Sequence, residues 1–214
     1  MSDSQLSTPE PIPEADSAAV PVRKRPKPGE RRVQILQALA TMLEQPGAER
    51  ITTAALAARL EVSEAALYRH FASKAQMFEG LIEFIEQSVF TLVNQITERE
   101  SAGTAQAAKV VTMLLQFAEK NPGMTRVMVG DALVFENERL QQRMNQFFDK
   151  IESTLKQSLR SAGEGDGSAT PSMDAQVRAS MLTSFAVGRL QRFARSGFRR
   201  MPSEHLEASL AQML

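Results

Sequence analysis

The apolar residues of this sequence recur at steps of three and four from Glu30 to the C-terminus, and no segment alternates like a β-strand. A chain with this pattern buries its apolar faces by packing helices together, so the predicted fold class is all-α, with about nine helices. The predicted helices cover about residues 30–44, 52–60, 63–71, 73–98, 104–121, 124–129, 136–160 and 174–195, and a last one follows Pro202 and Ser203. The segment 104–121 is apolar on most faces, which places it in the centre of a bundle. The Gly- and Ser-rich segment from Ser161 to Ser172 predicts a flexible loop.

The first 29 residues differ from the rest of the chain. They contain six of the ten prolines and almost no large apolar side chains, which predicts a disordered, acidic leader. The leader ends in a basic arm made of Arg23, Lys24, Arg25 and Lys27. Such an arm beside a DNA-binding module adds phosphate or minor-groove contacts, and the alternative is an inert tail.

The net charge of zero hides an uneven distribution. Residues 1–19 carry four acidic residues and no basic one, whereas residues 20–76 carry ten basic residues against five acidic ones. The remaining residues, 77–214, carry fifteen basic and sixteen acidic residues. The local field decides whether a phosphate backbone is attracted, so the basic N-terminal region remains compatible with nucleic acid.

Several classes of protein are excluded by composition. The chain has no Cys, which removes disulfide scaffolds, thiolate metal sites and Cys nucleophiles, and its two histidines, His70 and His205, are isolated. We therefore expect no metal and no cofactor. No phosphate loop or Ser/His/Asp set is present, so we expect no enzyme. No apolar run reaches the roughly 18 residues of a membrane span, and the leader does not resemble a secretory signal, so a cytoplasmic protein is predicted.

The most informative stretch runs from Ile51 to Phe78. Two short predicted helices are separated there by the turn Glu61-Val62-Ser63, the spacing of a helix-turn-helix. The apolar residues that would hold the two helices against the first helix are Leu56, Leu60, Val62, Leu67 and Phe71. The residues left on or near the exposed end of the second helix are Thr53, Ser63, Glu64, Ala65, Tyr68 and Arg69. Short side chains allow close approach to the major groove, and hydroxyl groups and arginine supply hydrogen-bond donors.

This stretch resembles the DNA-binding domain of the TetR family of regulators. The resemblance is carried by Thr52-Thr53, Leu56-Ala57, Val62-Ser63, the run Leu67-Tyr68-Arg69-His70-Phe71, and Lys74. It implies a helix-turn-helix domain over residues 30–75 and a larger helical domain for dimerisation and partner binding over residues 76–214. It also implies a homodimer that binds a palindromic site in double-stranded DNA.

The resemblance assigns roles to individual residues of the DNA-binding domain. Tyr68, His70 and Lys74 correspond to residues that hold the phosphate backbone, and the candidates for the groove-facing edge are Thr53, Ser63, Ala65 and Arg69. Thr52 is a further candidate for DNA binding. Two of these roles have an alternative. Tyr68 is either a phosphate contact or a partly buried tyrosine, and His70 is either a phosphate contact or a residue that caps the end of a helix.

Further segments resemble one branch of that family, the nucleoid occlusion factors. They include NPGMTRVM, ALVFENERLQQRMNQFF and RFARSGFRR. The resemblance implies a nucleoid-associated dimer that binds the C-terminal tail of the division GTPase FtsZ and inhibits Z-ring assembly over the nucleoid. The tail would bind between helices 73–98 and 104–121, at Phe84, Lys120 and Asn121. Lys120 stands where the branch has Arg, and Leu92, Met113 and Gln116 also differ.

The helical pattern also bears on Phe84, on the dimer interface and on the alternative function. Phe84 lies off the apolar stripe of its helix, so it either packs on the DNA-binding module or contacts a partner. The last two helices are expected to form the dimer interface, and the arginines near them are interpreted as a solvated rim: Arg189, Arg192, Arg195, Arg199 and Arg200. The alternative function is a repressor that responds to a small molecule, which requires a pocket inside the helical domain.

Overall fold

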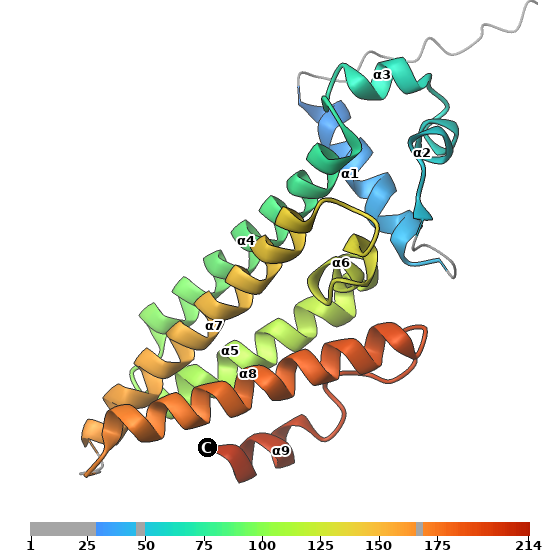
Figure 1. Cartoon of the computed structure of the whole chain (residues 1–214). Helices are drawn as coiled ribbons and strands as arrows, with labels where there is room; N and C mark the ends of the chain where they lie inside the picture. The colour runs from blue at the N-terminus through green and yellow to red at the C-terminus, as the bar shows by residue number, and fades with distance from the viewer. Residues whose placement is uncertain (1–28, 46–49, 166–168) are drawn as a thin grey trace, which may run out of the picture.

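The computed structural model describes residues 29–45, 50–165 and 169–214, and every regular element within these ranges is a helix. The prediction of an all-α fold is confirmed (Figure 1). The elements are α1 (Glu30–Leu43), α2 (Thr53–Arg59), α3 (Glu64–Tyr68), α4 (Lys74–Arg99), α5 (Gly103–Lys120), α6 (Pro122–Met128), the 3-10 helix η2 (Asp131–Leu133), α7 (Glu138–Gly165), α8 (Pro171–Arg195) and α9 (Leu206–Met213). The predicted disordered leader and its basic arm lie outside the described residues.

Hydroxyl side chains set the starts of the three helices that follow α1. Thr52 accepts a hydrogen bond from the backbone N–H of Ala55 at 3.1 Å, and Ser63 accepts one from Ala66 at 3.3 Å. Ser73 does the same for Gln76 at the start of α4, at 3.2 Å. Each bond satisfies one of the N–H groups that a helix leaves unpaired at its first turn. Thr52, Ser63 and Ser73 are therefore the N-caps of α2, α3 and α4.

The helices form a small head and a longer body. Figure 1 shows α1, α2 and α3 together at one end, with α4 leading out of them and running beside α7. Helix α5 lies inside the body, packed against α4, α7 and α8, and its buried side chains include Val110, Val111, Leu114 and Leu115. The central position predicted for this apolar segment is thus confirmed.

Helix α6 joins the head to the body. The backbone of Gly123 lies so close to α1 that a Cβ atom built on it would stand 1.9 Å from the carbonyl oxygen of Ala40. On its other side, the buried hydroxyl of Thr125 donates to the carbonyl oxygen of Ala118 in α5 at 2.9 Å. A short helix with contacts this close on two sides fixes the position of α1 relative to α5.

The segment predicted as a flexible loop from Ser161 to Ser172 is shorter than expected. Helix α7 continues through Gly165 and α8 begins at Pro171, so the prediction is wrong for residues 161–165 and 171–172. Residues 166–168 are not described. Packing outweighs the weak helix propensity of this segment, because Ala162 lies against the backbone of Gly103 in α5. Proline at the first position suits a helix start, which also explains why α6 begins at Pro122 rather than near residue 124. The sequence pattern did not predict η2.

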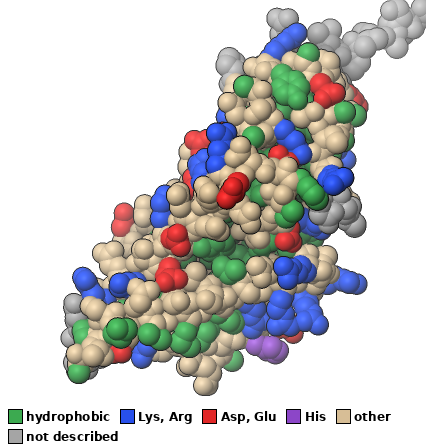
Figure 2. Space-filling view, in the orientation of Figure 1, with side chains coloured by type: hydrophobic (Ala, Val, Ile, Leu, Met, Phe, Trp, Pro, Cys, Tyr) green, Lys and Arg blue, Asp and Glu red, His purple; other side chains and the backbone are tan. Residues whose placement is uncertain are grey.

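The arginines near the end of α8 divide into two groups. Arg192, Arg195, Arg199 and Arg200 are exposed, as expected for a solvated rim, and Figure 2 shows basic side chains gathered in this part of the surface, close to a histidine. Arg189 is half-buried instead. Its guanidinium group lies 4.9 Å from the centre of the Phe185 ring and donates to the hydroxyl of Ser209 at 3.4 Å. Arg189 therefore helps to hold α9 against α8, so the interpretation as rim is wrong for this residue.

Candidate DNA-binding site and partner groove

The core of the head fixes the angle between α2 and α3. Leu56 of α2, Leu67 of α3 and Phe71 after α3 are buried, together with Ile35 and Leu39 of α1. The predicted apolar contacts are present, although Leu60 and Val62 are only partly buried. Burial of these faces turns the opposite face of α3 outward, which is the arrangement of a helix-turn-helix.

The outward face of α3 carries the residues predicted to meet DNA. Ala65, Tyr68, Arg69 and His70 are exposed, and so are the capping residues Thr52 and Ser63. Tyr68 is 46% exposed, so it is a partly buried tyrosine whose ring is still accessible to a phosphate. Thr53 is half-buried between α2 and α3. Most of these candidates are thus accessible to solvent, and Lys74 follows as the first residue of α4.

A hydrogen-bonded chain crosses this surface from α3 to α2 and back. The hydroxyl of Thr53 donates to Oε2 of Glu64 at 2.6 Å, and the hydroxyl of Tyr68 lies 3.5 Å from the Thr53 oxygen, which accepts from it. A carboxylate only accepts hydrogen bonds, so the direction of the chain is fixed from Tyr68 through Thr53 to Glu64. The sequence placed Glu64 near the exposed end of α3 but gave it no role.

The end of α3 is fixed to the first turn of α1 by Arg32. Its Nη1 donates to the carbonyl oxygen of His70 at 3.0 Å, and its guanidinium carbon lies 4.1 Å from the centre of the Phe71 ring. The side chain of His70 itself is exposed. Arg32 was not among the predicted site residues, because the two partners are 38 positions apart and no local pattern connects them.

Lys74, predicted to hold a phosphate, is paired with a carboxylate of the body. Its Nζ lies 2.5 Å from Oε1 of Glu136, in the segment between η2 and α7. The Lys74 side chain is 30% exposed and that of Glu136 is 9% exposed. A phosphate that approaches Lys74 therefore competes with Glu136 for the same ammonium group.

We expect Glu136→Gln to raise the affinity for duplex DNA by up to about fivefold, because the substitution removes this competitor from Lys74 and a partly exposed ion pair is worth up to about 1 kcal/mol. Fluorescence anisotropy with a labelled duplex measures the change. The matched control is Glu138→Gln, which removes the same charge two residues away. The effect should vanish in a Lys74→Ala background, and its persistence there would assign it to net charge instead.

Two further ion pairs connect α4 to α7. Arg139 pairs with Glu79, and Arg143 forms two hydrogen bonds with Glu86, from Nε at 3.1 Å and from Nη2 at 2.6 Å. The hydrogen bond to Glu86 raises the pKa of Arg143 above its usual value. These pairs attach the helix that leaves the head to the body along its first half.

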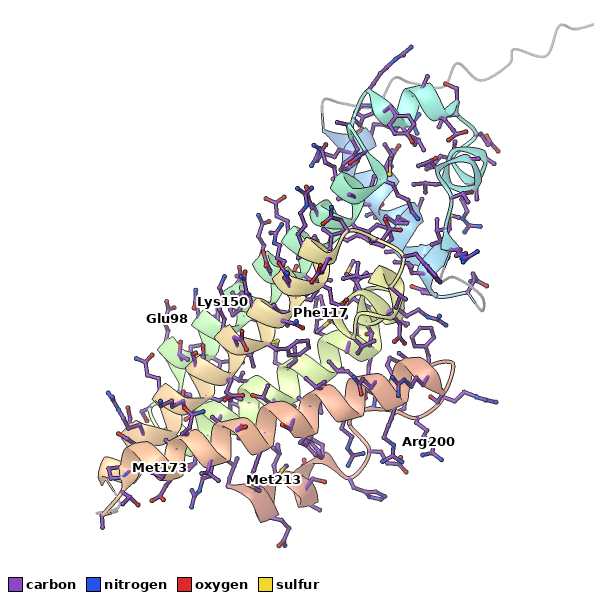
Figure 3. All side chains as sticks on the ribbon, viewed as in Figure 1. Glu98, Phe117, Lys150, Met173, Arg200 and Met213 are labelled. Carbon is purple, nitrogen blue, oxygen red and sulfur yellow. The ribbon has the colours of Figure 1, made fainter. Side chains whose placement is uncertain are left out.

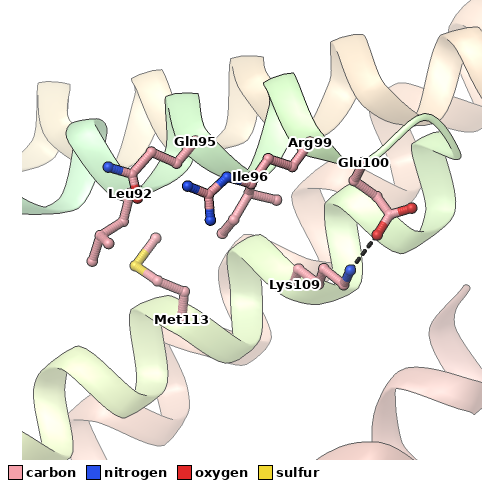
Figure 4. A pocket seen from close by; sticks show the side chains of 7 residues that line it. All are labelled: Leu92, Gln95, Ile96, Arg99, Glu100, Lys109 and Met113. Atoms are coloured by element: carbon pink, nitrogen blue, oxygen red, sulfur yellow. Dashed lines mark hydrogen bonds and ion pairs between the residues drawn. The ribbon is translucent and has the colours of Figure 1, made fainter.

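A shallow groove lies between α4 and α5, at the end of the body remote from the head. It has a volume of about 280 Å³ and is lined by Leu92, Gln95, Ile96, Arg99, Glu100, Lys109 and Met113. Figure 4 shows Leu92 of α4 facing Met113 of α5 across it. At one end Lys109 pairs with Glu100, which lowers the pKa of that carboxyl group. The groove is therefore apolar at its floor and charged at its rim.

The residues predicted to bind a partner lie along the same two helices. Phe84 of α4 is 47% exposed, so a large part of its ring is accessible to a partner. Lys120 is exposed at the last residue of α5, and Asn121 is half-buried, its amide donating to the carbonyl oxygen of Phe117 at 2.7 Å. Phe117, labelled in Figure 3, is partly buried and packs against the core. Asn121 thus ends α5 as well as facing the surface near Lys120.

None of the helices in the described ranges is both long enough and apolar enough to cross a membrane.

Both the head and the body match models of known protein families. Residues 35–81 match the model of the bacterial regulatory proteins of the tetR family, and residues 104–214 match a tetracyclin repressor-like C-terminal domain of the SlmA type. Solved structures with the same fold include the transcriptional regulator FadR from Bacillus subtilis in complex with stearoyl-CoA (TM-score 0.66, 15% identity, 85% of this chain and 96% of that one). They also include the MbdR regulator from Azoarcus (TM-score 0.70, 16% identity, 86% and 97%). Head and body together thus have the architecture of a TetR-type regulator.

Proteins with similar sequences identify one group within the TetR-type regulators. The nucleoid occlusion factor SlmA of Idiomarina loihiensis is 51% identical over 178 residues, which cover 83% of this chain and 90% of the relative. The SlmA of Aliivibrio fischeri is 52% identical over 181 residues, 84% and 92% of the two chains, and that of Vibrio cholerae is 51% identical over 178 residues, 83% and 90%. The chain belongs to the TetR family and, within it, to the SlmA nucleoid occlusion factors. This family consists of DNA-binding regulators and not of enzymes, in agreement with the sequence analysis.

Proposed function

We propose that this protein is a nucleoid-associated, cytoplasmic nucleoid occlusion factor: a homodimer that binds palindromic DNA sites on the chromosome and, when bound, captures the C-terminal tail of FtsZ and inhibits Z-ring assembly. The observation that carries the proposal is an identity of about half to curated SlmA proteins over most of both chains. An identity at this level extends through the body, the part that differs most among regulators with different partners.

The head supports the first half of the proposal. Its exposed face combines the groove-facing candidates Ala65 and Arg69 with the phosphate candidates Tyr68 and His70. A single helix-turn-helix reads only a few base pairs, so specificity requires two heads on two half-sites. The basic arm of Arg23, Lys24, Arg25 and Lys27, predicted from the sequence to add contacts to the backbone, belongs to the same proposed interface.

An exposed stripe on α8 supports dimerisation through the last two helices. Met173, Val177 and Met181 are exposed at steps of four, and Ser184 and Gly188 continue the same line. A Cβ atom built on Gly188 would meet no atom within 4 Å, so the backbone is open to a close approach there. Hydrophobic side chains are visible along the lower edge of the molecule in Figure 2, and Figure 3 places Met173 near the start of α8. An apolar stripe with small residues at one end suits two copies of α8 that cross at that end.

We expect Val177→Asp to dissociate the dimer, because it would bury an unpaired carboxylate at the interface on each protomer. The dissociation constant should rise by at least about a hundredfold, which sedimentation velocity at micromolar protein concentration detects as a monomer. Val134→Asp is the matched control, since Val134 is 64% exposed, against 51% for Val177, and lies between η2 and α7. A dimer that survives Val177→Asp would rule out this face.

The groove between α4 and α5 supports capture of a peptide tail. The two helices run antiparallel. Phe84 lies eight residues before Leu92 on α4, and residue 121 lies eight residues after Met113 on α5, so each is displaced by about 12 Å in the same direction along the groove. The proposed footprint therefore begins at Phe84, Lys120 and Asn121 and continues to the facing pair of Leu92 and Met113. The groove is lined by the apolar side chains of Leu92, Ile96 and Met113 and has Arg99 beside them, and Lys120 is exposed at the other end of α5. This combination suits an extended segment that carries both apolar and acidic residues.

The experiment that tests the proposal is a pull-down of purified FtsZ by this protein, with and without a duplex that carries its selected site. We expect retention of full-length FtsZ, loss of retention when the C-terminal tail of FtsZ is removed, and stronger retention with DNA present. No retention in either condition would contradict the proposal. Release of DNA by a small apolar effector, together with no FtsZ binding, would instead support the alternative of a ligand-responsive repressor.

A further inference from the structure

A carboxylate stands on the surface that α3 offers to DNA. Glu64 is the first residue of α3 and is exposed, and Tyr68 lies one helical turn further along the same helix. DNA carries about one negative charge per 1.7 Å of its axis, so a carboxylate here is repelled by the backbone. A carboxylate in this position weakens binding to every DNA sequence, unless it accepts a hydrogen bond from a base that only some sequences offer.

The position of the Glu64 carboxylate is set by its neighbours and not by the helix end. The N-terminus of α3 is capped by Ser63, which accepts from Ala66, so Glu64 is not needed as a cap. Its Oε2 is held by the Thr53 hydroxyl at 2.6 Å, and Thr53 in turn accepts from Tyr68. Within the described part of the chain, Oε1 has no hydrogen-bond partner. One oxygen is thus anchored to α2, and the other remains available as an acceptor.

The edges of the bases in the major groove decide which base suits such an acceptor. Guanine presents two acceptors and thymine presents an acceptor and a methyl group, so both repel a carboxylate. Adenine presents a donor beside an acceptor, and a carboxylate has no proton for that acceptor. Cytosine presents its N4 amino group as a donor. The N-terminal residues of a recognition helix are the ones that reach base edges.

We infer that Glu64 is a specificity-determining residue that reads a cytosine in each half-site, through its free Oε1, while Thr53 holds Oε2. This inference rests on the proposed binding of a palindromic site by α3 and names a base within that site. Thr53 acts here as a positioning residue: its single hydroxyl proton is used on Glu64, so it does not donate to the DNA while the carboxylate is held.

The test is a selection of binding sites from random duplexes with the wild-type protein, followed by the same selection with Glu64→Ala and Glu64→Gln. We expect the wild type to select a C·G pair at one position of each half-site, with a preference of about tenfold over the other pairs. Glu64→Ala should lose the preference at that position alone. Glu64→Gln should move the preference to adenine, because an amide both donates and accepts.

Net charge is separated from base reading by Glu44→Gln, which removes one negative charge from the exposed end of α1. All three variants lose a negative charge and are therefore expected to bind non-specific DNA somewhat better. The decisive quantity is the ratio between the affinity for the selected site and the affinity for the same site with that cytosine replaced. An unchanged ratio in Glu64→Ala and Glu64→Gln would overturn the inference while leaving the proposed function intact. Failure of the wild type to select any sequence would contradict the proposed function itself.

Discussion

Gly123→Ala is expected to lower the free energy of unfolding by about 3 kcal/mol or more, because the new methyl group meets backbone and not a flexible side chain. Its Cβ atom would lie 1.9 Å from the carbonyl oxygen of Ala40 and 2.8 Å from the carbonyl carbon. Neither α1 nor α6 can give way alone, since α1 carries the core of the head and α6 is bonded to α5 through Thr125. For a chain of this size the corresponding fall in melting temperature is about 6 to 12 °C, measured by thermal unfolding at fixed protein concentration.

The matched control for this substitution is Gly80→Ala. Gly80 also lies in a helix that faces α1, but its Cβ atom would meet the ends of the Leu36 side chain at 3.1 and 3.2 Å. Leu36 is only partly buried and has room to change rotamer, so we expect a cost of less than about 1.5 kcal/mol. Equal melting temperatures for the two variants would show that α6 moves freely against α1, contrary to the close contact described above.

The positions of the helices were largely predictable because each depends on local pattern. Apolar steps of three and four set the buried faces of α4, α5, α7 and α8, and hydroxyl residues before α2, α3 and α4 marked the starts of those helices. The prediction was wrong where packing outweighed propensity. At the end of α7, Gly163 and Gly165 favoured a loop, yet the helix continues past Ala162, which lies against Gly103 of α5, to residue 165.

The residue types of the candidate site were predictable, but their connections were not. Thr53, Tyr68 and Lys74 were identified by resemblance, each as a separate DNA contact. In the structure Thr53 and Tyr68 form one hydrogen-bonded chain with Glu64, and Lys74 is paired with Glu136, which is 62 positions later. Pairs this distant in sequence are brought together only by the packing of head on body, and no local period or motif predicts them.

Phe84→Ala is expected to weaken binding of the FtsZ tail at least about thirtyfold and to leave DNA affinity unchanged. An exposed aromatic side chain is a common kind of residue to dominate a peptide interface, and truncation of such a residue costs about 2 kcal/mol or more. Phe84 is 47% exposed, so its removal takes little from the core. Isothermal titration with a synthetic tail peptide and anisotropy with labelled DNA measure the two affinities.

Phe135→Ala provides the control for this last prediction, because it removes the same side chain from another exposed position. Phe135 is 57% exposed in the segment between η2 and α7, where Arg50 lies over its ring at 4.5 Å, well outside the groove. Peptide affinity should therefore be preserved in Phe135→Ala. If Phe84→Ala reduced both peptide and DNA binding, Phe84 would be a structural residue of α4. If it reduced neither, the tail would have to bind elsewhere, and the groove between α4 and α5 would lose its proposed occupant.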